Sequence, residues 1–167
     1  MVPFPAMAQG YLAPKGRMLG WITRTHVSLY RRTGGFIGMA MPAPDEGFRR
    51  LDCLLLTTTG RKSGLERTVA LPFFQYDGRI ILVGSNAAQK NNSAWYLNIV
   101  ADPRITVEIG ALRMEAHAEV LDGEDYDVLW ERHKQLWPRW AEYDRQVERR
   151  IPLVEICLKT GEKAAAE

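Results

Sequence analysis

The chain has 167 residues, of which 46% are hydrophobic and 25% are charged, as expected for one globular domain with a substantial core. No apolar run approaches the ~20 residues of a membrane span, and no secretory segment follows the first residues, which predicts a cytoplasmic protein. The 22 basic and 20 acidic residues give a net charge of only +2. That balance disfavours nucleic-acid binding, which needs a broad basic surface.

The basic charge is concentrated near the N terminus. Residues 1–44 carry Lys15, Arg17, Arg24, Arg31 and Arg32 and no acid, so the rest of the chain sums to −3. Residues 1–14 contain three prolines and are expected to be a disordered arm. A helix is expected over residues 15–32, with a linker to residue 44. The helix either lies on an anionic membrane surface or packs on the domain with a solvated basic face.

The most informative stretch is residues 54–64, Leu-Leu-Leu-Thr-Thr-Thr-Gly-Arg-Lys-Ser-Gly. The Leu and Thr run predicts a strand, and the glycines predict a tight turn that presents Arg61, Lys62 and Ser63. Backbone N–H groups beside an Arg and a Lys suit a phosphate group. This is not a Walker A loop, because residues 68–74 are strand-like where such a loop needs a helix. A solvated charged turn is the other interpretation.

Antiparallel strands dominate the remaining pattern. Asp77-Gly78 predicts a hairpin between strands at 67–76 and 79–84, and alternation predicts a second pair at 105–109 and 112–120 with one wet face. A strand at 151–158 is expected at a sheet edge, because Pro152 lacks an N–H. Helices are expected at about 94–98, after Asp122 and at about 139–149. About six strands favour an α+β fold with a small β-barrel over residues 45–159 and a frayed tail at 160–167.

The chemically capable residues favour a cofactor over a metal. The three histidines have no second ligand at metal spacing, so no metal site is expected, and the two cysteines, Cys53 and Cys157, are expected to be buried reduced thiols. No Gly-x-Ser-x-Gly elbow is present. The cations of residues 61–67, the small residues after Gly84 and the later aromatic residues suit a nucleotide-like or flavin-like cofactor. The alternative for Trp95, Trp130 and Trp137 is ordinary core packing.

Residues 55–64 resemble the signature turn of the deazaflavin-dependent nitroreductase and quinone reductase group, whose members use coenzyme F420. The likeness is collinear over about residues 20–158. It continues through Arg67, Pro72, Asp77-Gly78, Gly84-Ser85-Asn86, Ala94-Trp95-Tyr96-Leu97-Asn98, Asp102-Pro103 and Ile151-Pro152, with His26–Gly35 upstream. A lone Gly-Arg-Lys-Ser-Gly is a weak signal, whereas the ordered set is specific.

The resemblance implies a split β-barrel of the flavin-binding pyridoxamine oxidase type that binds coenzyme F420. It assigns the cofactor's phosphate and acidic tail to Arg61, Lys62, Ser63 and Arg67. It assigns the ring to Thr68, Val69, Ala70, Leu71 and Pro72, to Val83, Gly84, Ser85 and Asn86, and to Ala94, Trp95, Tyr96, Leu97 and Asn98. Family members place tyrosines of a C-terminal helix over the ring. Here Trp137 and Trp140 stand at two such positions, only Tyr143 keeps a hydroxyl, and Asn86 and Ser93 replace the Lys and Pro of some members.

The predicted activity is hydride transfer from reduced coenzyme F420 to an electron-poor small molecule such as a quinone, an activated alkene or a nitro compound. Tyr143 and Ser85 are the expected catalytic residues, which donate a hydrogen bond or a proton to the anion left by hydride transfer. The alternative is a non-catalytic barrel that binds a lipid, a haem or another flavin. The expected assembly is a monomer or weak dimer, with the N-terminal helix as its contact with an anionic membrane surface on the cytoplasmic face.

Overall fold

A computed structural model describes residues 17–35, 40–42 and 50–158 of the chain. Its strands are β1 (Ala40–Pro42), β2 (Arg50–Thr59), β3 (Glu66–Pro72), β4 (Phe74–Tyr76), β5 (Arg79–Val83), β6 (Arg104–Ile109), β7 (Leu112–Val120) and β8 (Leu153–Leu158). Its helices are α1 (Arg17–Arg32), α2 (Ala94–Ala101), α3 (Gly123–Leu136) and α4 (Pro138–Gln146), with a short 3₁₀ turn, η2 (Asn86–Ala88). The predicted arm at 1–14 and tail at 160–167 lie outside the described residues.

The sheet curls into a barrel because one bent stretch of chain forms both of its ends. The antiparallel strand order is β3-β2-β6-β7-β8-β5-β4, and β1 pairs with the first residues of β2. Only Phe73 separates β3 from β4, so the first and last strands of that order are adjacent in sequence. The Phe73 N–H donates to the Asp52 carbonyl oxygen at 2.9 Å, which fixes the bend. The predicted α+β barrel is therefore present.

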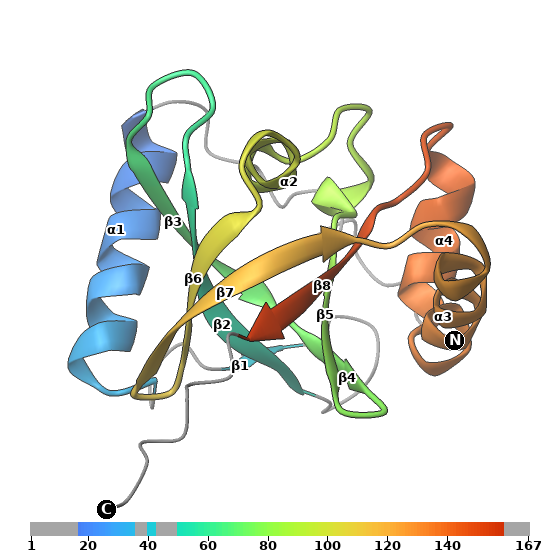
Figure 1. Cartoon of the computed structure of the whole chain (residues 1–167), viewed down its shortest axis with the longest axis horizontal. Helices are drawn as coiled ribbons and strands as arrows, with labels where there is room; N and C mark the ends of the chain where they lie inside the picture. Colours follow the sequence, from blue (N-terminus) through green and yellow to red (C-terminus); the bar gives the residue numbers. More distant parts are fainter. Residues whose placement is uncertain (1–16, 36–39, 43–49, 159–167) are drawn as a thin grey trace, which may run out of the picture.

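The helices cover different sides of this barrel (Figure 1). Helix α1 lies along one side, α3 and α4 lie on the opposite side, and α2 lies across one end beside the loops before and after it. Strand β2 is buried on both faces because of α1: Leu54 and Leu56 point into the barrel cluster, whereas Leu55 packs against Val27 and Tyr30 of α1. This contact explains why β2 is a continuous apolar run with no alternation of polar residues.

Polar contacts also attach the end of α1 to the barrel. The buried Tyr30 hydroxyl accepts a hydrogen bond from the Gly110 N–H at 2.9 Å and contacts the carbonyl oxygens of Cys53 and Glu108. Arg31 forms a bidentate ion pair with Glu108, with Nε 2.9 Å from Oε2. The sequence predicted Glu108 on a wet face, and that prediction is wrong because α1 covers it and leaves the residue 7% exposed.

Three further expectations differ from the structure. Strand β8 lies between β5 and β7, so the prediction of an edge strand is wrong. The strand begins one residue after Pro152, so the missing N–H of this proline lies outside the strand, and its carbonyl oxygen still accepts a hydrogen bond from the Gly84 N–H. The strands number eight in the described part, not six, because β1 forms in the expected linker and the bend at Phe73 divides one strand. Cys157 is half-buried, whereas Cys53 is buried, and both are free thiols.

Candidate functional site

The β2–β3 hairpin is a tightly folded loop that leaves its cations exposed. The last pair of the ladder is Thr59 with Glu66, and the Gly60 carbonyl oxygen accepts from the N–H groups of both Ser63 and Gly64. A Cβ on Gly60 would lie 2.8 Å from the Ser63 hydroxyl oxygen and 3.0 Å from the Leu65 carbonyl oxygen, so only glycine fits there. The backbone folds onto itself at Gly60 and the side chains of the loop point outward.

Asn98 of α2 fixes this hairpin to the end of the barrel. Its buried side chain accepts a hydrogen bond from the Arg61 N–H at 3.2 Å and donates one to the Thr58 hydroxyl at 3.0 Å. One amide therefore joins the helix, the strand and the first residue of the loop. Sequence reasoning placed Asn98 along the cofactor ring, and the structure shows that it also holds the loop in position.

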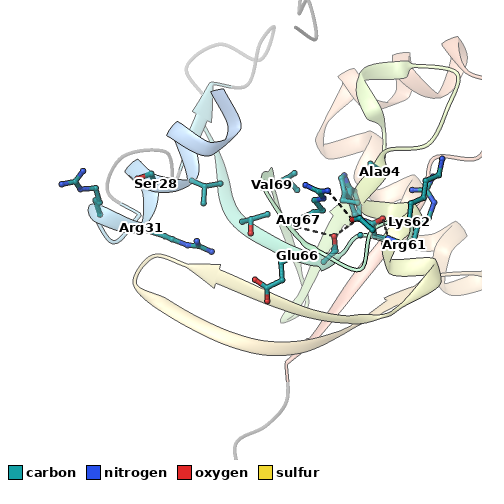
Figure 2. A pocket seen from close by; sticks show the side chains of 16 residues that line it. Ser28, Arg31, Arg61, Lys62, Glu66, Arg67, Val69 and Ala94 are labelled. Carbon is teal, nitrogen blue, oxygen red and sulfur yellow. Dashed lines mark hydrogen bonds between the residues drawn. The ribbon is translucent and has the colours of Figure 1, made fainter. Parts of the chain in front are cut away.

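A cleft of about 1000 Å³ opens between the hairpin, α1 and the start of α2. Figure 2 shows Arg61 and Lys62 on the side near Ala94, Ser28 and Arg31 on the opposite side, and Glu66, Arg67 and Val69 between them. The predicted cofactor residues that line this cleft are Arg61, Lys62, Ser63, Arg67, Thr68, Val69, Ala94, Trp95 and Asn98. The hairpin and α2 predictions thus meet in one cavity, at the volume expected of a cofactor site.

The cations of the cleft differ in their partners. Arg31 is bound to Glu108, and the Arg67 guanidinium lies 3.4 Å from the Ser63 hydroxyl. Arg32, Arg61 and Lys62 have no carboxylate partner among the described residues. Several exposed cations around one cavity repel one another, so they favour an anionic ligand such as a phosphate or a carboxylate tail.

Sequence reasoning missed the wall that α1 contributes. Val27, Ser28, Arg31 and Arg32 line the cleft together with Thr58, Gly60 and Glu66. The sequence offered the basic charge of this helix as a signal, but a linker separates it from the hairpin. Only the packing of Tyr30 against the barrel brings the helix to the cleft.

Several residues predicted to contact the ring lie outside the lining of the cleft and pack against the core. Ala70 packs against the α1 contact, Leu71 and Tyr96 pack against the barrel cluster, and Pro72 and Leu97 are half-buried outside the cleft lining. Alternation in β3 explains part of this result, because successive side chains of a strand point to opposite faces.

The remaining predicted residues lie toward the α4 side and do not line the cleft. Val83 and Tyr143 pack against the cluster that contains the buried Trp140, and the Arg139 Nε donates to the Tyr143 hydroxyl at 2.8 Å. Ser85 and Asn86 lie in the loop before α2. Gly84 approaches the residue before β8 so closely that a Cβ would lie 2.5 Å from the side chain of Pro152. The two hydroxyls expected to be catalytic, those of Tyr143 and Ser85, therefore lie outside the lining of the cationic cleft.

The α3–α4 side also buries a histidine that the sequence analysis did not assign. His133 is fully buried, its Nδ1 lies 2.5 Å from the Tyr76 hydroxyl, and its Nε2 has no partner among the described residues. Burial lowers the pKa of this imidazole from 6.5 to about 3, so the ring is neutral at physiological pH. Aromatic rings of Phe74, Trp130 and Trp140 surround it, which makes it part of the core.

No group of three metal-ligating side chains occurs among the residues that the structure describes. Within the same residues, no helix has the length and hydrophobicity needed to cross a membrane.

Comparison with known proteins assigns the chain to a family. The sequence profile described as F420H(2)-dependent quinone reductase matches residues 21–158. The chain belongs to this family. It is therefore an F420-dependent oxidoreductase, which confirms the predicted cofactor and enzyme class.

Individual relatives agree with this assignment. The F420H(2)-dependent quinone reductase of Mycobacterium tuberculosis (strain ATCC 25618 / H37Rv) is 29% identical over 136 residues, which cover 80% of this chain and 87% of the relative. A solved structure described as the F420-H2 dependent reductase FDR-A is 31% identical, with a TM-score of 0.55, and the match covers 62% of this chain and 92% of that one. Another, described as a domain-swapped dimer, is 26% identical with a TM-score of 0.59, covering 82% and 97%. The predicted split barrel is thus confirmed.

The residues of the cleft fit coenzyme F420. The cofactor carries a phosphate and an acidic tail, and the exposed cations of the hairpin and of α1 supply the opposite charge on two sides of the cleft. The aromatic Trp95 and the small Ala94 and Val69 supply the apolar surface that a flat ring needs.

Proposed function

We propose that this protein reduces a quinone with reduced coenzyme F420. The observation that supports the proposal is the cleft beside the β2–β3 hairpin in a member of this family. Arg32, Arg61 and Lys62 line this cavity of cofactor size and have no carboxylate partner among the described residues. Activated alkenes and nitro compounds are further acceptors that the same chemistry permits. Any of them needs to be electron-poor, because the reaction delivers a hydride.

In this proposal the two sides of the molecule have different roles. Arg61, Lys62 and Arg67 bind the phosphate and tail of the cofactor, and coenzyme F420 supplies the hydride when it is bound in its reduced form. Reduction of a quinone to the quinol takes one hydride and one proton, both of which the reduced cofactor carries. Tyr143 donates a hydrogen bond or a proton to the quinone oxygen, and its phenol oxygen is held by Arg139. Ser85 is the second candidate donor.

The decisive experiment is a parallel titration of the purified full chain with reduced coenzyme F420 and with FMN, followed by fluorescence, and then turnover with the quinone menadione. We expect saturable binding of the deazaflavin alone and oxidation of reduced F420 only when menadione is present. Binding of FMN with equal affinity, or binding of F420 without turnover of any quinone, would support a non-catalytic barrel instead.

We also propose that α1 brings the protein to anionic membrane surfaces. The support is the absence of acids from residues 1–44 and the exposed Leu29 on the described part of the helix. Truncating α1 is a poor test, because Tyr30 and Arg31 hold the helix to the barrel. Reversing two N-terminal charges, Lys15→Glu with Arg17→Glu, should reduce sedimentation with phosphatidylserine vesicles, and high salt should weaken it further. Equal sedimentation of the variant and the unchanged chain, or none by either, would rule out this contact.

A further inference from the structure

We propose that Arg149 is a positioning residue for hydride transfer, because its guanidinium orients the backbone N–H groups of Ser85 and Asn86 as donors toward the oxygen of the acceptor. This inference rests on the proposed quinone reductase function. It adds two backbone donors, the N–H groups of Ser85 and Asn86, and the Arg149 side chain that orients them.

Arg149 binds the loop before α2 through carbonyl oxygens alone. Its Nη2 lies 2.6 Å from the Ser85 oxygen, its Nη1 lies 3.4 Å from the Gly84 oxygen, and its Nε lies 3.2 Å from the Gln89 oxygen. A further contact at 3.4 Å joins Nη1 to the carbonyl oxygen of Arg150. One planar side chain, located just after α4, therefore holds both ends of the turn Ser85–Gln89.

The geometry of the peptide unit converts this contact into an orientation. The C=O and the following N–H of a trans peptide point in opposite directions. When Arg149 holds the Gly84 and Ser85 carbonyl oxygens, the N–H groups of Ser85 and Asn86 must point away from the guanidinium. A cation at the carbonyl end also polarises the peptide, which strengthens the N–H as a donor at the other end.

The backbone of this turn has a conformation that concentrates N–H groups. Ser85 is right-handed, with φ of −63°, and Asn86, Ala87 and Ala88 follow with φ values of 50°, 49° and 56°. A right-handed residue followed by a left-handed one brings successive N–H groups together into a concave anion site. Three left-handed residues with a Cβ are unfavourable, so this turn needs outside contacts to persist. The Asn86 side chain supplies one of them by donating to the Asn91 carbonyl oxygen at 2.8 Å.

These N–H groups have no protein partner in the described part of the chain. Among the described residues, no hydrogen bond is made by the N–H of Ser85, Asn86 or Ala87, while the N–H groups of Ala88 and Gln89 close the turn. The loop leads into Ala94 and Trp95 at the start of α2, and these two residues line the cationic cleft. Backbone N–H donors without a partner act as an oxyanion hole when negative charge develops on a substrate oxygen that they bind. The hydride places such a charge on the quinone.

The charge of Arg149 sets it apart from its neighbours. Arg150 pairs with Asp122, and Arg79 pairs with Asp125 and Glu155, whereas Arg149 has no carboxylate partner among the described residues. It is half-buried, and this burial lowers its pKa from the usual value. Because no carboxylate neutralises this half-buried cation, its positive charge acts on the peptide groups of the turn whose carbonyl oxygens it binds.

The test compares Arg149→Ala and Arg149→Lys with the control Arg145→Ala, which removes an exposed arginine of α4 that has no hydrogen bond or ion pair among the described residues. We expect Arg149→Ala to lower kcat with menadione about 10- to 100-fold, less than complete removal of an oxyanion donor. The KM for menadione and the Kd for reduced F420 should change less than about threefold. Arg149→Lys should recover part of the loss, millimolar guanidinium should recover part of it in Arg149→Ala, and Arg145→Ala should match the unchanged chain.

A second measurement needs neither cofactor nor turnover. Lys90 is exposed within the same loop, so endoproteinase Lys-C should cleave the cofactor-free Arg149→Ala protein after Lys90 faster than the unchanged chain. If Arg149→Ala is cleaved faster but its kcat is unchanged, Arg149 only stabilises the loop, and the inference is overturned. A rise in the Kd for F420 as large as the fall in kcat would overturn it too, because the donors would then serve the cofactor. If the unchanged chain fails to reduce menadione, the proposed function fails, and equal cleavage rates would then show that Arg149 does not hold the turn.

Discussion

The β2–β3 hairpin and the α3–α4 side differ in how their cationic side chains are paired with carboxylates. At the hairpin, Arg61 and Lys62 are exposed and have no carboxylate partner among the described residues. On the α3–α4 side, Arg79 and Arg132 pair with Asp125 and Asp77 at 2.7 and 2.5 Å. Paired surface charges are explained by the fold alone, whereas a cluster of unpaired cations disfavours the isolated fold and is explained by a ligand.

The interiors of the two regions differ as well. The buried amide of Asn98 fixes the hairpin through Thr58 and the Arg61 N–H, and both of these residues line the cationic cleft. The α3–α4 side buries His133 and Trp140 among aromatic rings, so these two side chains are core residues and not part of an exposed surface. The two regions should therefore respond differently to substitution. Substitutions at the hairpin should alter cofactor affinity, and substitutions on the α3–α4 side should alter turnover or stability.

The largest effect is expected at Tyr143. Tyr143→Phe removes only the hydroxyl that Arg139 holds, so turnover should fall by roughly 10- to 1000-fold if that oxygen supplies a proton or a strong hydrogen bond. The Kd for reduced F420 should stay nearly unchanged, because Tyr143 does not line the cationic cleft. Steady-state kinetics with menadione and fluorescence titration measure the two quantities.

Tyr126→Phe is the matched control for this change. It removes a hydroxyl that donates to the Ile151 carbonyl oxygen at 2.9 Å inside the core, so it should lower stability by about 1 kcal/mol and leave turnover unchanged. If Tyr143→Phe turns over like the unchanged chain, Tyr143 only packs and Ser85 becomes the donor to test.

The hairpin should give a smaller effect, and one confined to binding. A charged hydrogen bond to phosphate contributes about 1.5–3 kcal/mol, so Lys62→Ala and Arg67→Ala should each raise the Kd for reduced F420 roughly 10- to 150-fold. The double variant should lose less than the sum if both cations bind one phosphate. Thermal unfolding should barely change, because both side chains are exposed.

Arg132→Ala is the control from the other region. It breaks an exposed pair with Asp77 and should leave the Kd for reduced F420 unchanged. Unchanged affinity in Lys62→Ala, Arg67→Ala and the double variant would return the hairpin to a solvated turn. The likeness to the family would then extend to the fold and not to this site.

Local signals in the sequence were enough to predict the hairpin turn, the Asp77-Gly78 turn and most strands. Each depends on residues close in sequence: φ values of 52° and 82° at Asp77 and Gly78 are those that a two-residue turn requires. Position in the sheet was not predictable for β8, because its neighbours β5 and β7 come from distant parts of the chain. The α1 wall of the cleft and the Arg149 contacts were missed for the same reason. Arg149 and Gly84 are joined only by tertiary structure, and no spacing rule connects them.

The interiors of the two regions should also differ in how the stability of the fold depends on pH. The pKa of His133 is lowered to about 3 in the fold by burial, against 6.5 in the unfolded chain. Between these values only the unfolded chain binds the proton, so the stability that this residue contributes is complete above pH 6.5 and is lost as the pH falls toward 3. The free energy of unfolding should therefore drop by about 1.4 kcal/mol for each pH unit below 6.5. Urea unfolding of the unchanged chain and of His133→Gln over this range measures the slope. Because glutamine does not titrate, the variant should show a shallower slope by about that amount. Equal slopes would mean that His133 takes up its proton within the folded core, and the contrast between this buried interior and the exposed hairpin would lose its strongest physical basis.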